Sequence, residues 1–227
     1  MRDKALTSAQ ASIACLAKVA VSRFEGNDEE GLARFAKSFK FESWVELEEF
    51  IHNAANLRDA RTAQYTRLLD ADIETAWEFL ADSAKLETWM FPAEFEAKPG
   101  ANFNFYPEGW HGKIGVFERG REIRFDAVAG GWTWFSLKPI DDRQTEFMLR
   151  DYMAPDYVVA DEIRRHPDDL ERDQPGGIGT HWQGVLAGWH TGTDTLQDLF
   201  RETKRNWSYD ALCNLYDILI HDYHRLA

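Results

Sequence analysis

Between residues 99 and 151 apolar and polar side chains alternate, and this alternation constrains the fold more than any other feature of the chain. Successive side chains of a β-strand point to opposite faces of the sheet, so each alternating run gives its strand one apolar face. Several runs follow the Pro99-Gly100 turn, and another turn falls at Asp141-Asp142. The pattern predicts an antiparallel meander with one buried face. Its inward set is Phe103, Phe105, Ile114, Val116, Phe125, Phe135, Leu137, Phe147 and Leu149.

Helices are predicted on both sides of this meander. Thr62 to Leu69 reads as a further strand, and Ile73 to Trp89 as two short helices split at Asp82-Ser83. A long helix begins at His181 and ends near Arg205, and a last helix covers residues 208–226. The apolar stripe of the long helix consists of Trp182, Val185, Leu186, Trp189, Leu196, Leu199 and Phe200.

The first 60 residues are predicted to be all-helical and to form a separate module. Helical spacing covers residues 5–24 and 32–39, and a third helix begins at Ser43, where Glu46 completes a capping-box signature. The composition changes near Arg58-Asp59-Ala60. We therefore expect a helical module over residues 1–60 and a second domain over residues 61–227.

Residues 154 to 180 form a connection much longer than the usual ~4 to 6 residues. The segment is acidic and ends in Pro175-Gly176-Gly177, which resembles a hinge. We expect a mobile lid here.

From about residue 62 to 201 the order of elements is that of the α+β helix-grip fold, and several motifs match one family. They are Ile73-Glu74-Thr75-Ala76-Trp77, Leu86 with Trp89, Pro99-Gly100 before Phe103 and Phe105, His111-Gly112 before Glu118, Thr145 before Phe147 and Leu149, and Gly188-Trp189 before Leu196 and Leu199. With them the chain resembles the heat-shock-protein-90 ATPase-activator-homologue-like branch of the SRPBCC superfamily, whose fold START domains share. Gly120 stands where this family commonly has proline, and the family usually has a shorter connection than residues 154–180.

The resemblance implies a curved sheet wrapped around the long helix, with a cavity between them for a small, largely apolar ligand. Trp189 is predicted to be a cavity wall, because it shares a helix face with Trp182 and Leu196 while Gly188 and Gly192 add no bulk beside it. The alternative is that the same side chains fill a core. The predicted ligand-contacting residues are Arg67, Trp89, Phe103, Phe105, Trp110, Ile114, Val116, Phe125, Phe135, Phe147, Asp151, Trp182 and Trp189.

Two polar residues are expected inside the grip. Asp151 has the parity of Phe147 and Leu149, and Arg67 lies on the first strand of the domain. A carboxyl in an apolar cavity would have a raised pKa and could act as an acid or base, although such a residue more often reaches water at a strand end. If Arg67 and Asp151 converged, an enzyme of the polyketide cyclase or dehydratase kind would be the second hypothesis. A co-chaperone or interaction protein is the third.

Composition argues against several other classes of function. Lys and Arg total 26 against 39 Asp and Glu, and the net charge of −13 disfavours nucleic acid. No stretch approaches the length of a membrane helix and no secretory core is seen, so the cytoplasm is expected. A homodimer or a protein partner is left open.

No cofactor or metal is expected. Cys15 and Cys213 lie in unrelated segments, and neither His181 with His190 nor His221 with His224 has a convincing third ligand. These histidines are interpreted as solvated or capping residues. The chain has no nucleophile elbow and no phosphate loop, so no catalytic residue is assigned.

Overall fold

The computed structural model describes residue 17 and residues 28–59, 61–105, 110–154, 180–205 and 208–226. Within them eight strands form one antiparallel sheet, in the order β1-β2-β8-β7-β6-β5-β4-β3. The strands are β1 (Asn56–Asp59), β2 (Thr62–Leu69), β3 (Ala93–Phe95), β4 (Asn102–Phe105), β5 (Trp110–Glu118), β6 (Glu122–Ala127), β7 (Trp132–Pro139) and β8 (Thr145–Tyr152). The predicted meander is confirmed, and its buried side chains alternate along β2, β7 and β8.

The described helices begin and end where the chain supplies caps. The hydroxyl of Ser43 accepts a hydrogen bond from Glu46 N over 3.2 Å, as the capping signature predicts, and Asp72 caps the next helix through Thr75 N. None of the described helices combines the length and hydropathy that a bilayer span requires. They are α2 (Asp28–Ser38), α3 (Trp44–His52), α4 (Ile73–Ala81), α5 (Ser83–Leu86), α7 (Thr180–Arg201) and α8 (Tyr209–Leu226).

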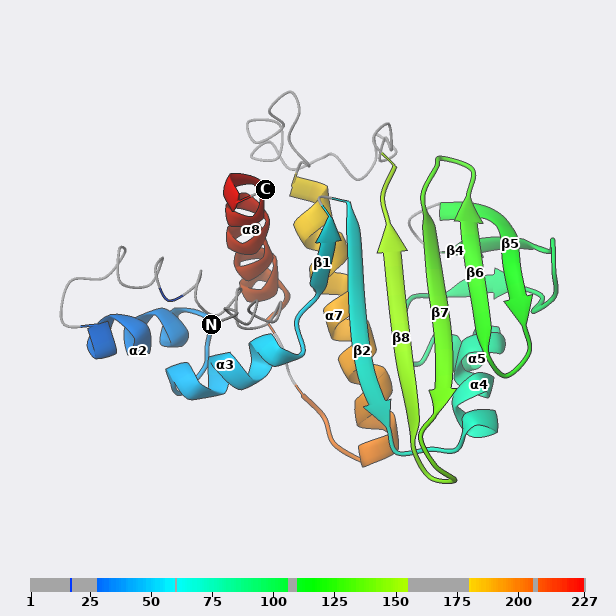
Figure 1. Ribbon diagram of the computed structural model, residues 1–227, viewed down its shortest axis with the longest axis horizontal. Helices are drawn as coiled ribbons and strands as arrows, with labels where there is room; N and C mark the ends of the chain where they lie inside the picture. The colour runs from blue at the N-terminus through cyan, green and yellow to red at the C-terminus, as the bar shows by residue number, and fades with distance from the viewer. Residues whose placement is uncertain are drawn as a thin grey trace, which may run out of the picture.

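The long helix α7 packs along one face of the sheet, here called the inner face, and α8 packs on α7. Figure 1 views the sheet with α7 behind β2. Tyr65 on β2 donates to the carbonyl of Leu186 on α7 over 2.7 Å, and Gln197 reaches the carbonyl of Leu68 over 2.9 Å. One hydrophobic core joins the sheet, α7, α8, α2 and α3. This architecture confirms the α+β helix-grip fold.

The all-helical prediction for the first 60 residues is wrong at its end. Residues 56–59 form β1, which pairs with β2 so that Leu57 lies opposite Ala63 and Asn56 opposite Gln64. A short Asn-Leu-Arg-Asp run carries no strand pattern of its own, because its pairing depends on β2 and not on local propensity. The domain boundary itself stays a prediction. The predicted helix over residues 5–24, residue 17 apart, and the predicted lid lie outside the described residues.

Candidate functional site

The inner face of the sheet carries a continuous array of aromatic rings. The centroid of Phe105 lies 4.9 Å from that of Phe125, which lies 5.6 Å from Phe135, which in turn lies 5.9 Å from Phe147. These three contacts are tilted or T-shaped, the arrangement that aromatic quadrupoles favour. Trp89, which follows α5, lies 5.6 Å from Phe135 and is also buried. The sequence therefore placed these residues on the correct face, and their contact with a ligand stays a prediction.

Three predicted tryptophans meet or flank this array. Trp189 on α7 is buried and lies 5.9 Å from Phe91 and 6.1 Å from Phe135. Trp182, seven residues earlier on α7, is also buried. Trp110 packs edge-on against Phe105 at 5.9 Å, and its buried indole Nε1 has no hydrogen-bond partner among the described residues. Phe103 and Ile114, which sequence also assigned to this face, are buried as well.

Glycines beside Trp189 differ in their surroundings. A Cβ added at Gly192 would lie 3.1 Å from the carbonyl oxygen of Trp89, so this glycine permits close packing of α7 against the residues after α5. A Cβ added at Gly188 would meet no described atom within 4 Å. Only Gly188 therefore has the open surroundings that were assumed for both glycines beside Trp189.

Val116 does not line the grip, contrary to the sequence prediction. The pairing of β5 with β6 shifts register between Ile114 and Val116, so Val116 lies opposite Arg124, which points to the outer face. Phe117 takes the inward position opposite Ile123 and packs on Trp77 at 5.7 Å. A β-bulge adds one residue to a strand and inverts the parity of all residues beyond it.

Asp151 lies on the inner face of β8 and is only 3% exposed. Thr133, opposite it on β7, donates its hydroxyl to Asp151 Oδ1 over 2.6 Å. Burial raises the pKa of Asp151 to about 7, against the lowering effect of hydrogen bonds from Thr133 and the Trp189 indole. The expectation that such a residue reaches water at a strand end is therefore wrong here, and the alternative with a raised pKa holds.

Arg67 is also on the inner face, but it does not converge with Asp151. On the β2–β8 pair Arg67 lies opposite Phe147, whereas Asp151 lies opposite Ala63. Arg67 and Asp151 are therefore four residues apart along the ladder, roughly 13 Å of strand. The Nε of Arg67 donates instead to Asp194 Oδ1 on α7 over 2.7 Å, with both side chains 1% exposed. The acid–base pair on which the enzyme hypothesis depended is therefore not formed.

Asp194 is the centre of a buried polar cluster that sequence reasoning missed. Arg205 Nη1 lies 3.1 Å from its Oδ1, and His190 Nε2 lies 3.4 Å from its Oδ2. Burial acts to raise the pKa of Asp194, but the nearby His190 imidazole and the charges of Arg67 and Arg205 together hold it well below its usual range. The carboxyl is therefore ionised at neutral pH.

His190 connects this cluster to the N-terminal helices. Its Nδ1 lies 2.8 Å from the hydroxyl of Tyr216 on α8, which also accepts the backbone N–H of Ala55 over 3.0 Å. The imidazole stacks on Phe50 of α3 at 4.3 Å. His190 is fully buried, so its interpretation as a solvated residue is wrong, and burial lowers its pKa. The signal available in the sequence was the polar spacing of His190, Asp194 and Gln197 along one side of α7.

Among the described residues no group of three potential metal ligands is found. The carboxyl of Asp194 has only one histidine beside it and is neutralised by two arginines. This cluster consequently links β2, α7, α8 and the segment after α3 through buried ion pairs and hydrogen bonds.

The sheet, the gripped helix and the aromatic inner face define the chain as a helix-grip protein of the α+β class. It is similar in structure to a conserved protein of unknown function from Enterococcus faecalis, at 14% identity over 79% of this chain and 98% of that one, with a TM-score of 0.57. CalU16 from Micromonospora echinospora has 14% identity over 76% and 94%, with a TM-score of 0.49. The Aha1 dimer from Colwellia psychrerythraea has 12% identity over 61% and 95%, with a TM-score of 0.44.

At identities this low, the likeness to these structures is one of fold alone. No protein-family model matches the sequence, and no curated protein matches it.

Proposed function

We propose that the interior of the grip binds a small, largely apolar molecule, and that Asp151 is its main polar contact. The observation that supports this proposal best is the position of Asp151, a buried carboxyl on the face that carries the aromatic array, with only neutral hydrogen-bond donors beside it. Burial of a carboxyl costs free energy unless it is paired, so fold stability alone does not explain a carboxyl at this position.

Asp151 has hydrogen-bonding capacity to spare. Its two oxygens offer about four lone-pair positions, of which Thr133 and Trp189 use two. Its neighbour across the strand pair is Ala63, whose methyl group leaves the carboxyl free of bulk on the β2 side. Trp110, at the other end of the ring array, adds a buried N–H without a described partner. A ligand with an aromatic or aliphatic body and one or two polar atoms suits these groups.

A neutral fluorescent probe tests the proposal. N-phenyl-1-naphthylamine has an apolar body and one N–H, and its emission rises when it leaves water. We expect Asp151→Asn and Trp189→Ala to weaken its binding about threefold to tenfold while circular dichroism shows a folded protein. Asp126→Asn and Trp132→Ala are matched controls, because both residues lie outside the grip, and they should leave binding unchanged.

The proposal is wrong if the probe does not bind to the wild-type protein, or if all four variants bind it equally well. Unfolding of Trp189→Ala alone would leave Asp151→Asn to decide, since this substitution is nearly isosteric.

A further inference from the structure

The outer face of the sheet, on the side away from α7, carries three aromatic side chains, Trp132, Trp134 and Tyr152. Trp134 lies opposite Arg124 on β6 and Arg150 on β8, and both guanidinium carbons stand 5.8 Å from its ring centroid. Trp132 and Tyr152 continue the aromatic surface along the same strands, with ring centroids 5.8 Å apart. All three aromatic side chains are half-buried.

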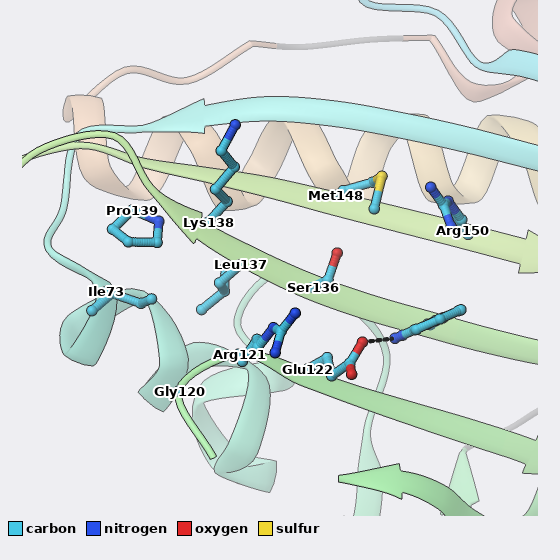
Figure 2. A pocket seen from close by; sticks show the side chains of 11 residues that line it. Ile73, Gly120, Arg121, Glu122, Ser136, Leu137, Lys138, Pro139, Met148 and Arg150 are labelled. Atoms are coloured by element: carbon cyan, nitrogen blue, oxygen red, sulfur yellow. Dashed lines mark hydrogen bonds between the residues drawn. The ribbon is translucent and has the colours of Figure 1, made fainter. Parts of the chain in front are cut away.

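A pocket of about 550 Å³ opens on this face, within the size range of small-molecule sites. Figure 2 shows Ser136 and Met148 in neighbouring positions, with Lys138 on one side of them and Arg150 on the other. Ile73, at the start of α4, and Gly120 form the rim near Arg121. The full lining is Ile73, Gly120, Arg121, Glu122, Trp134, Ser136, Leu137, Lys138, Pro139, Met148 and Arg150.

Three cations and one carboxylate line this pocket, although the whole chain carries a net charge of −13. The carboxylate, Glu122, accepts a hydrogen bond from the Trp134 indole over 3.0 Å. Arg150 is held in place by the Trp134 ring and by Gln64, which accepts from its Nε over 3.2 Å. Its terminal nitrogens form no hydrogen bond with another described residue. The ammonium of Lys138 forms no ion pair with another described residue, although Glu146 lies opposite it on β8.

We propose that this outer-face pocket binds a small anionic amphiphile, a carboxylate or phosphate group on an apolar body. The anionic group lies between Lys138 and Arg150 over the Ser136 hydroxyl, and the apolar body lies on Met148 and Ile73. A guanidinium fixed by stacking loses little freedom when it binds an oxyanion, and it offers a planar pair of donors. The site is independent of the grip, because Trp134, Lys138 and Arg150 face away from α7.

Octanoate, octyl phosphate and octanol are suitable probes, followed through the indole N–H resonance of Trp134 in a protein labelled with ¹⁵N. The Trp134 resonance, assigned with the variant Trp134→Phe, should shift when either anion binds. Octanol should bind at least about threefold more weakly than the anions. Lys138→Ala should weaken octanoate binding about threefold to tenfold. Lys113→Ala is the matched control, because Lys113 also lies on the outer face opposite a carboxylate, Asp126, but outside the pocket.

Equal binding of octanol and octanoate, or equal losses in the two lysine variants, overturns the proposal. If the Trp134 resonance shifts when the protein concentration is raised but not when a probe is added, the outer face contacts a second copy of the chain instead. Asp151→Asn should not change octanoate binding at Trp134. A loss of octanoate binding in Asp151→Asn would place the bound anion in the grip and would likewise overturn the outer site.

Discussion

Asp151 and Asp194 are buried to nearly the same degree, at 3% and 1% exposure. Asp151 contacts Trp189 on α7, and Asp194 belongs to the same part of α7, where it lies beside His190. Their acidities are nevertheless shifted in opposite directions. Asp151 has only neutral donors, and burial raises its pKa to about 7. Asp194 has two arginines and a histidine around it, and its pKa is lowered. The charge of the partners, and not the depth of burial, therefore decides which aspartate holds a proton at neutral pH.

The largest effect is expected from Asp194→Asn. This change removes the counter-charge of Arg67, whose side chain is 1% exposed, and an uncompensated buried charge typically costs about 3 to 5 kcal/mol. Urea denaturation at pH 7 measures the loss in the free energy of unfolding. Asp70→Asn is the control, because its ion pair with Arg201 is about 40% exposed on each side and should matter by less than ~1 kcal/mol.

The second effect is a pH dependence that belongs to Asp151. Its pKa in the folded state is higher than the ordinary aspartate value of 3.8, so the folded state binds the proton more tightly. This contribution is complete at low pH and is lost as the pH rises through about 7. Between pH 5 and pH 8 the loss amounts to roughly 2 to 3 kcal/mol of unfolding free energy.

Asp151→Asn should flatten this dependence, and urea denaturation at several pH values measures it. His190 acts in the opposite sense, because its lowered pKa makes stability rise with pH up to about 6.5. The difference between variant and wild type removes the contribution of His190. If this difference does not change between pH 5 and pH 8, Asp151 is not the titrating group.

The smallest effect concerns the hydroxyl that contacts Asp151. Thr133→Val removes a 2.6 Å hydrogen bond, which should cost about 1 to 2 kcal/mol at pH 8 and less at pH 5, since bonds to a charged acceptor are stronger. Thr145→Val is a matched control, because Thr145 is equally buried but donates to the backbone oxygen of Ala71. Its cost should be the same at both pH values, and equal pH behaviour of the two variants would contradict this account of Asp151.

The sequence predicted the strand faces well because side-chain parity is a local property. Phe103, Phe135 and Phe147 are all inward, as the alternation requires. Val116 is the exception, since the bulge after Ile114 depends on the geometry of the neighbouring strand and not on a pattern in β5 itself.

The polar partners could not be predicted in the same way. Parity placed Arg67 and Asp151 on one face, but their positions along the ladder come from strand register, which the turn lengths do not reveal over this distance. The actual partner of Arg67, Asp194, lies 127 residues away on a helix whose rotation about its axis is fixed only by tertiary packing. Only the spacing of His190 and Asp194 was visible beforehand.

The pairing of β1 with β2 also bears on how copies of the chain behave in concentrated solution. An uncovered β-strand at the border of a sheet is a template for another chain, and β2 would occupy that position without β1. β1 covers the Thr62–Gln64 end of β2. Further along, the backbone oxygens of Thr66 and Leu68 accept hydrogen bonds from the side chains of Arg67 and Gln197. The border strand of the described sheet is then β1, which at four residues is too short to offer much of a template. A chain cut at residue 60 would expose the Thr62–Gln64 end of β2 instead.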